Sequence, residues 1–199
     1  MERRSKMEPG LEKMNVWLCC DPGHDDALAI ILAGHHPRIN LIGVSTVAGN
    51  QTIERVTKNA LKVLSISGLS HVPVVQGSAK AMLRPQEACP EIHGETGLDG
   101  PTFPAHGCKA VEGKAVNVMY QIISRHKKVH LIATGPLTNV ALLLLVYPEV
   151  LEHLNSIHIM GGAIGAGNTS PCAEWNIQCD PGEEANRVVA RNGLSNDIL

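Results

Sequence analysis

The sequence predicts an α/β protein with an open, mostly parallel sheet and helices on both faces, in a Rossmann-like arrangement. Short apolar runs alternate along the chain with longer segments of helical periodicity. The runs are apolar throughout, which is typical of strands that are buried on both faces. A chain of 199 residues, of which 44% are hydrophobic, is long enough to enclose one such core.

The first half of the chain begins with residues 1–14, which we expect to be a flexible N-terminus. The elements expected after it are, in order, strand 16–20, helix 25–33, strand 40–45, helix 52–66 and strand 71–75. The first helix begins with acidic residues, which suit the positive end of a helix. Pro73 favours an edge or early position for the third strand, because proline cannot donate to a sheet ladder.

The segment 77–113 contains four prolines and no clear periodicity, so we expect a functional or disordered loop. Regular alternation then resumes with helix 115–125, strand 129–133, helix 138–146, strand 157–160 and helix 181–191. Pro148 ends the helix expected at 138–146. We therefore expect one domain over residues 15–191, followed by a divergent tail at 192–199.

Composition excludes several classes of protein. The net charge is −2 and aromatic residues make up 3%, so we expect no nucleic acid polymer as a partner. The longest aliphatic run, 140–146, is about a third of a membrane span, and we recognise no targeting segment, so we expect no membrane partner. The six cysteines show no C-x-x-C spacing, which favours buried free thiols in a reducing, cytoplasmic location.

Polar residues and glycines gather where the expected strands end. Three of the six aspartates, Asp21, Asp25 and Asp26, follow the first strand closely. Like charges at this range oppose ionisation unless a cation lies between them, and carboxylate oxygens favour Ca²⁺ or Mg²⁺ over zinc. The alternative interpretation of these residues is an acidic helix N-terminus with ordinary capping.

Five motifs occur in a fixed order along the chain. They are Asp-Pro-Gly-His-Asp-Asp at 21–26, Val-Ala-Gly-Asn at 47–50, Ile-His-Gly-Glu-Thr-Gly at 92–97, Thr-Gly-Pro-Leu-Thr-Asn at 134–139, and Met-Gly-Gly with Ala-Glu-Trp-Asn within 160–176. Together they resemble the inosine–uridine preferring nucleoside hydrolases, over residues 15 to about 190. The resemblance implies the nucleoside hydrolase fold, a bound Ca²⁺, and hydrolysis of the N-glycosidic bond of a small-molecule ribonucleoside to ribose and free base.

The resemblance also implies roles for individual residues. Asp21, Asp26 and the backbone carbonyl of Thr134 match calcium ligands, and Asp21 also matches the catalytic base. The residues that match substrate contacts are Asp25, Asn50, His93, Met160, Asn168, Glu174 and Asn176. We expect His24 to support this site from outside. Simpler alternatives remain open for three matches: a turn residue at Asn50, a surface histidine at His93 and core packing at Met160.

The sequence departs from the family pattern in two places. Cys19 stands where the family usually has an acid, and a neutral thiol cannot replace a carboxylate that supports a metal. Family members are also longer, and their final third supplies another calcium-binding aspartate and the histidine that protonates the leaving base; no histidine follows His158 here. We therefore expect a carboxyl-terminally truncated form, lacking the last third of the fold, with doubtful activity.

Two functional hypotheses follow from this pattern. The first is a calcium-dependent ribonucleoside hydrolase, which we expect to form a homo-oligomer if the full fold is present. The second is a catalytically inactive truncated isoform that binds ribosides or associates with other subunits through an uncovered part of its sheet.

Overall fold

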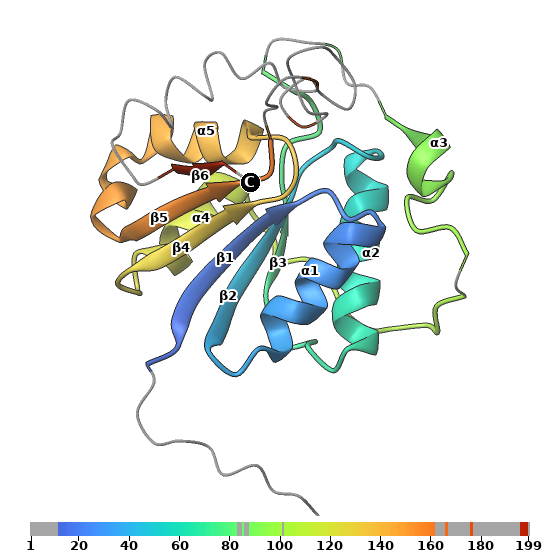
Figure 1. The fold of residues 1–199 in the computed structure, drawn as a ribbon, viewed down its shortest axis with the longest axis horizontal. Coiled ribbons are helices and arrows are strands. Elements are labelled where there is room, and N and C mark those ends of the chain that lie inside the picture. The colour runs from blue at the N-terminus through green and yellow to red at the C-terminus, as the bar shows by residue number, and fades with distance from the viewer. Residues whose placement is uncertain are drawn as a thin grey trace, which may run out of the picture.

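The structure, a computed structural model, is a central parallel sheet with helices packed on its two faces (Figure 1). It describes residues 12–82, 85, 88–100, 102–161, 166, 176 and 196–198. The helix expected at 181–191 lies outside these residues, as do most of the expected flexible start at 1–14 and part of the tail at 192–199.

The helices and strands follow the alternation that the sequence predicts. In chain order they are β1 (Met14–Cys20), α1 (His24–His35), β2 (Ile39–Thr46), α2 (Ile53–Ile66), β3 (Val74–Gln76), α3 (Pro90–His93), α4 (Ala115–Ile123), β4 (Val129–Ala133), α5 (Thr138–Val146), the 3₁₀-helix η1 (Pro148–Glu152), β5 (Leu154–Ile159) and β6 (Asn196–Ile198).

The strands are arranged in the order β3-β2-β1-β4-β5-β6, and every neighbouring pair is parallel. This confirms the predicted open parallel sheet, and β3 lies at its edge as Pro73 suggests. In such a sheet the carboxyl ends of all strands lie along one border, which we call the carboxyl edge. Ligands bind at this border in this class of fold. The turns that follow β1, β2 and β4 are therefore neighbours.

Side chains of β1 alternate between two hydrophobic cores, one on each face of the sheet. Val16, Leu18 and Cys20 belong to the core beneath α1 and α2, whereas Trp17 and Cys19 belong to the core beneath α4 and α5. Figure 1 shows the two helix pairs on opposite sides of the strands. Because both faces are covered, β1 is apolar at every central position, as the sequence indicates.

The boundaries of the edge elements differ from the sequence-based expectation. β3 begins at Val74 rather than at residue 71, because Pro73 has no N–H to donate and its carbonyl instead accepts from Val44 at 2.9 Å. β5 begins at Leu154 rather than at 157. The polar Ser156 can lie within this buried strand because its side chain is hydrogen-bonded to His130. β6 lies within the expected tail and pairs with β5.

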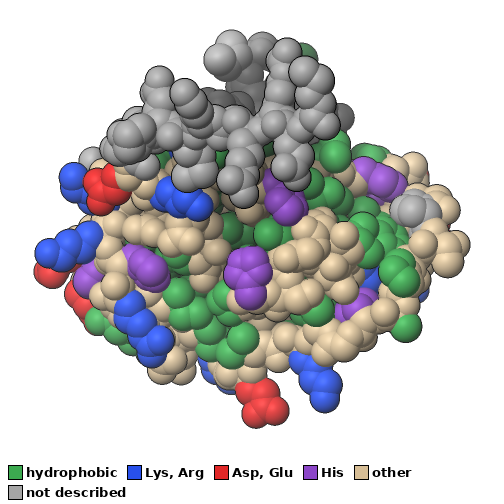
Figure 2. Space-filling model, turned by 90° about the horizontal axis from the view of Figure 1, so that it is seen from below, with side chains coloured by type: hydrophobic (Ala, Val, Ile, Leu, Met, Phe, Trp, Pro, Cys, Tyr) green, Lys and Arg blue, Asp and Glu red, His purple; other side chains and the backbone are tan. Residues whose placement is uncertain are grey.

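One face of the molecule carries both signs of charge. Figure 2 shows Lys and Arg side chains distributed among acidic, histidine and hydrophobic side chains, without a continuous basic stripe among the residues coloured there. Within the described part of the chain, no helix combines the length and the apolar composition that a membrane crossing requires.

Candidate active site

The expected site residues come from the turns after three adjacent strands. Asp21 follows β1, Asn50 lies in the turn after β2, and Thr134 follows β4. Because β2 and β4 pair with β1 on its two sides, the three turns meet at the carboxyl edge of the sheet. The structure thus brings these predicted residues together although they are distant in sequence.

Asp21 is buried, with 1% of its surface exposed. Its Oδ2 accepts a 2.7 Å hydrogen bond from the backbone amide of Asn50, whose side-chain amide donates a 3.0 Å bond to the carbonyl of Asp21. Its Oδ1 is buried and has no hydrogen-bond partner among the described residues. A buried carboxylate oxygen without a donor is costly, so this atom points to a missing ligand or proton.

Two glycines enclose the carboxylate of Asp21. A Cβ atom at Gly49 would lie 2.1 Å from Oδ2, and one at Gly135 would lie 2.6 Å from Oδ1. Both distances are shorter than any real carbon–oxygen contact of this kind, so no larger residue fits at either position. The glycines of the second and fourth motifs therefore allow the backbone to approach the carboxylate.

Asp26 is also buried, on the first turn of α1. Its Oδ2 accepts a 3.2 Å bond from the amide of Gly23, and its Oδ1 accepts a 2.5 Å bond from the hydroxyl of Thr134. Asp26 therefore caps the helix, as the alternative interpretation of the acidic cluster proposes. Capping does not account for Asp21, which precedes the helix and whose carboxylate accepts its hydrogen bond from Asn50 and not from the first turn of α1.

Burial changes the protonation of both carboxylates. It raises the pKa of Asp21 well above its ordinary value, and the neighbouring charge of Asp26 raises it further. Burial also raises the pKa of Asp26 to about 7, although the hydrogen bond from Thr134 opposes this rise. Two adjacent buried carboxylates with raised pKa values need a shared proton or a cation to neutralise them.

The carboxylate oxygens of this pair suit a divalent cation. Oδ1 of Asp21, which has no hydrogen-bond partner in the described structure, and the neighbouring carboxylate of Asp26 are oxygen ligands of the kind that Ca²⁺ and Mg²⁺ prefer. Within the described residues, no group of three or more His, Cys, Asp or Glu side chains is arranged around one point. The residues present therefore fit a hard cation, but additional ligands would have to be carbonyls or groups of the substrate.

Asn176 joins two more of the predicted site residues. Its side-chain amide donates a 2.8 Å hydrogen bond to the carbonyl of Thr134 and a 3.2 Å bond to the carbonyl of Met160. Asn176 is 3% exposed. The carbonyl that matches a metal ligand is therefore already an acceptor in this structure. The predicted residues Asn168 and Glu174 lie outside the described part of the chain.

His93 and Asp25 lie near each other and are less deeply buried than Asp21 and Asp26. Nε2 of His93 is 3.9 Å from Oδ1 of Asp25, and their side chains are 14% and 55% exposed. Burial lowers the pKa of His93, while the charge of Asp25 opposes this shift. Gly23 permits the close approach of the imidazole, because a Cβ there would lie 2.8 Å from two ring atoms of His93.

Cys89 contacts this site although no sequence motif indicates it. Its thiol is 3.4 Å from Oδ1 of Asn50, and its backbone amide donates a 3.2 Å bond to the carbonyl of Asn50. Cys89 lies in the proline-rich segment, whose course has no periodic signal. The hydroxyl of Thr134 was also missed, since only its carbonyl matched the family pattern.

Cys19 occupies the position of the usual family acid. It is fully buried, and its sulfur lies 2.9 Å from the hydroxyl of Ser45, which also accepts a 3.1 Å bond from the indole of Trp17. Burial raises the pKa of Cys19 to about 12. The thiol is therefore neutral, and it supplies no negative charge beneath the aspartates.

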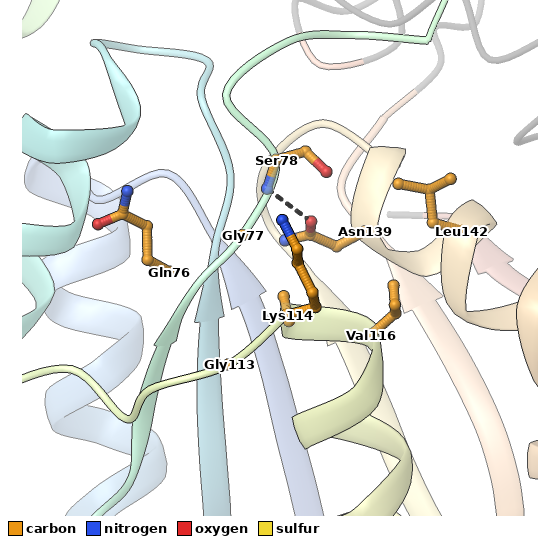
Figure 3. Close-up of a pocket in the computed structure, with 9 residues that line it drawn as sticks. Gln76, Gly77, Ser78, Gly113, Lys114, Val116, Asn139 and Leu142 are labelled. Carbon is orange, nitrogen blue, oxygen red and sulfur yellow. Dashed lines mark hydrogen bonds between the residues drawn. The ribbon is translucent and has the colours of Figure 1, made fainter.

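A cavity of about 480 Å³ lies between the end of β3 and the first residues of α4 and α5 (Figure 3). Its lining includes Lys114 and Ser78 but none of the predicted site residues. Asn139 beneath it accepts a 3.0 Å bond from the amide of Ser78 and donates a 2.7 Å bond to the carbonyl of Thr46. The last residue of the Thr-Gly-Pro-Leu-Thr-Asn motif therefore has a structural role, joining the turns after β2 and β3.

Sequence relatives can be aligned with most of this chain. It is 46% identical over 178 residues to a pyrimidine-specific ribonucleoside hydrolase of Shewanella sp. strain MR-7, a match that covers 89% of this chain and 55% of the relative. It is 44% identical over 195 residues to a probable ribonucleoside hydrolase of Dictyostelium discoideum, covering 92% of this chain and 56% of that protein. The chain thus spans about half the length of the curated relatives it matches.

Solved structures show the same arrangement. A purine-preferring ribonucleoside hydrolase from Gardnerella vaginalis superposes with a TM-score of 0.85 at 31% identity, covering 92% of this chain and 59% of that one. A plant nucleoside hydrolase superposes with a TM-score of 0.82 at 29% identity, covering 94% and 59%. The family model described as inosine-uridine preferring nucleoside hydrolase matches residues 16–198. With the buried aspartate pair at the carboxyl edge of its parallel sheet, the chain belongs to the inosine–uridine preferring nucleoside hydrolase family.

Proposed function

We propose that this chain hydrolyses the N-glycosidic bond of ribonucleosides, giving ribose and a free base. The observation that carries the proposal is the buried pair of Asp21 and Asp26, in which Oδ1 of Asp21 has no hydrogen-bond partner in the described structure. The relatives and solved neighbours named ribonucleoside hydrolases support the same activity. They differ in the base they prefer, so we propose no preference for this chain.

The reaction passes through a ribose ring with oxocarbenium character. Negative charge close to the ring stabilises this positive charge, and Asp21, Asp25 and Asp26 supply it in so far as their carboxyl groups are ionised. Asp21 is the base that removes a proton from the attacking water, because burial raises its pKa and so increases its affinity for that proton. The bonds from Asn50 hold its carboxylate in one orientation for this transfer.

We propose that Asp21, Asp26 and the carbonyl of Thr134 would hold Ca²⁺. When bound, such an ion would lower the pKa of water and neutralise the two carboxylates. The carbonyl of Thr134 accepts one 2.8 Å bond from the amide of Asn176 and has a second lone pair with which it could bind the ion. We propose that Asn176 binds a ribose hydroxyl together with Asn168 and Glu174, while Asn50, Met160 and His93 contact the rest of the nucleoside.

A second candidate function is a catalytically inactive module that binds ribosides or associates with other subunits. One observation favours it: both oxygens of Asp26 and the carbonyl of Thr134 already accept hydrogen bonds within the chain. Within the described structure only Oδ1 of Asp21 accepts no hydrogen bond in this pair of carboxylates, so a cation would share each of the other oxygens of the pair with a donor of the chain, which predicts weaker binding. Cys19 adds no charge that would strengthen it.

We also propose a reducing, cytoplasmic location for this chain. The free, buried thiols of Cys19, Cys20 and Cys89 support this proposal.

Ribose release from inosine and from uridine, with Ca²⁺ present, tests the proposal. Asp21→Asn keeps the shape of the side chain but removes the base, so we expect turnover in the parent chain and its loss in the variant. Glu54→Gln changes an exposed acid on α2 and is the matched control. Nucleoside binding by calorimetry without turnover would support the second candidate. A chain that neither binds nor hydrolyses a nucleoside would overturn both the hydrolase and the riboside-binding module.

A further inference from the structure

Three polar side chains at the start of α2 bind three successive carbonyls of the turn at residues 94–99, which follows His93 and which we call the histidine turn. The donors and their acceptors, in chain order, are Gln51 and the carbonyl of Gly94 at 3.2 Å, Arg55 and the carbonyl of Glu95, and Asn59 and the carbonyl of Thr96 at 2.8 Å. We call these three side chains the α2 donors. They are spaced four residues apart, as neighbours along one side of a helix are, and their acceptors are consecutive. The histidine turn therefore runs along α2.

The histidine turn holds its own shape through its amides. The carboxylate of Asp99 accepts bonds of 2.9 and 3.0 Å from the amides of Glu95 and Thr96. Both bonds lie within the turn, so they do not determine where the turn stands on the protein. Leu98 fixes its far end, because its side chain is buried in the core beneath α1 and α2. The carbonyl bonds to the α2 donors fix the end that follows His93.

Arg55 acts on this end of the turn in two ways. It donates directly to the carbonyl of Glu95, and it also donates a 2.9 Å bond to Oε1 of Gln51. Because a guanidinium group can only donate, Oε1 of Gln51 must face it, which leaves Nε2 to donate to the carbonyl of Gly94. The carboxylate of Glu95 is 3.8 Å from Arg55, but the two side chains are 48% and 81% exposed, so this ion pair contributes little.

Asn59 joins the histidine turn to the turn that follows β1. It is buried, and its Nδ2 donates a 3.3 Å bond to the carbonyl of Pro22, the residue after Asp21, in addition to its bond to Thr96. Gly97, with φ of 80°, allows the close approach, because a Cβ there would lie 3.0 Å from Nδ2 of Asn59. One buried amide therefore sets the separation between the two turns.

His93 directly precedes the first of the bound carbonyls. Its ring lies against the first turn of α1, where Nδ1 accepts a 3.4 Å bond from the amide of His24 and Nε2 is 3.9 Å from Oδ1 of Asp25. We propose that the α2 donors are positioning residues: by holding the carbonyls that follow His93, they place its imidazole beside Asp25, where it can contact a bound ribonucleoside. The inference rests on the proposed function for this ligand, but not for the placement of the ring.

The placement of the ring can be read from NMR spectra of the full chain. One Hα of Gly23 points along the direction in which a Cβ would lie 2.8 Å from Cε1 of His93, so we expect a nuclear Overhauser cross-peak between this Hα and Hε1 of His93, assigned with His93→Gln. Arg55→Met keeps the apolar stem and removes the donors, so the cross-peak should weaken; adding Gln51→Met should abolish it. Glu95→Gln removes the carboxylate but keeps the carbonyl, and this matched control should retain the cross-peak.

Three results would overturn the proposal: no cross-peak in the parent chain, full intensity in the double variant, or the same loss in Glu95→Gln as in Arg55→Met. A lower urea midpoint with the cross-peak intact is the second of these results, and it would show that the α2 donors only stabilise the fold. Nucleoside titration supplies a further readout. Arg55→Met should weaken binding by about 3- to 10-fold, the effect of one hydrogen bond, and Glu95→Gln should leave it unchanged. A chain that binds no nucleoside but shows the expected cross-peaks would contradict the proposed function and leave the positioning role supported.

Discussion

The backbone amide of Asn50 donates a 2.7 Å hydrogen bond to Oδ2 of Asp21, and its side-chain amide donates a 3.0 Å bond to the carbonyl of the same residue. One residue after β2 thus binds both the side chain and the main chain of the residue after β1. The orientation of the proposed base therefore depends on the neighbouring strand, and not on the helix that follows it.

Asn50→Ala should destabilise the chain by about 1–3 kcal/mol, because it leaves a buried carbonyl and the Cys89 thiol without their partner while the backbone amide remains. Urea unfolding followed by circular dichroism measures the change. The control is Asn15→Ala, whose partly buried side chain donates a 3.3 Å bond to the carbonyl of Lys127 and accepts a 2.9 Å bond from Asn40; because both bonds are exposed to solvent, it should cost no more than about 0.5 kcal/mol. Equal costs for the two variants would contradict a special role for Asn50.

Gly135→Ala should destabilise the fold and displace Asp21. The added Cβ would lie 2.6 Å from Oδ1 of Asp21 and 3.0 Å from both its amide nitrogen and Cγ1 of Val47, an overlap that costs about 1–3 kcal/mol. Gly107→Ala is a matched control, since nothing lies within 4 Å of the added atom. Thermal unfolding of both variants tests this, and a Gly135→Ala chain as stable as the parent would count against the close enclosure of the carboxylate.

His130 predicts a pH dependence of stability. Nδ1 of His130 and Nε2 of His158 each lie 2.7 Å from the hydroxyl of Ser156. Burial lowers the pKa of His130, and the charge of His158 lowers it further. Below about pH 6.5, the unfolded chain gains a proton here that the folded chain resists. The free energy of unfolding should therefore fall as the pH decreases from about 6.5 towards the folded pKa of His130.

Replacement by glutamine should remove that part of the pH dependence. Urea midpoints at about pH 7.5 and about pH 5.5, on either side of the ordinary histidine pKa, would be compared for the parent, His130→Gln and the control His71→Gln, which changes an exposed histidine. The decrease at low pH should be smaller only in His130→Gln. An identical decrease in all three chains would show that His130 does not contribute.

Cysteine alkylation should be selective. Cys19 and Cys20 are fully buried, and burial raises the pKa of both thiols, that of Cys19 to about 12. Cys108 is partly exposed. Iodoacetamide reacts with the thiolate, so Cys108 should be modified at least about a hundredfold faster than Cys19 in the folded chain. Peptide mass spectrometry measures the rates, and comparable rates without denaturant would contradict the buried positions.

The meeting of Asp21, Asn50 and Thr134 could be predicted because it depends only on strand order and direction. A parallel sheet places the carboxyl ends of neighbouring strands at one edge, and apolar runs are sufficient to locate those ends. The same reasoning places β4 at the observed bounds Val129–Ala133. The family resemblance then supplied the roles, which no pattern of hydrophobicity contains.

Other contacts of the site could not be predicted. Cys89 reaches Asn50 from a proline-rich loop whose course is set by tertiary contacts rather than by periodicity. The pairing of Thr134 with Asp26 depends on a side-chain rotamer, and the early start of β5 depends on the burial of a serine between two histidines. These contacts depend on side-chain packing in the assembled sheet, which the pattern of apolar residues does not specify.

The hydroxyl of Thr134 and the carboxylate of Asp26 are 108 positions apart in the chain, and they meet only after β4 has paired with β1. Contacts of such long range form late in folding, because a large loop must close first. A growing polypeptide therefore lacks the hydroxyl that binds Asp26 until β4 and the turn after it have been synthesised. Any ligand of this pair would bind the completed sheet and not its precursors, so raising the ligand concentration would favour the folded chain by mass action.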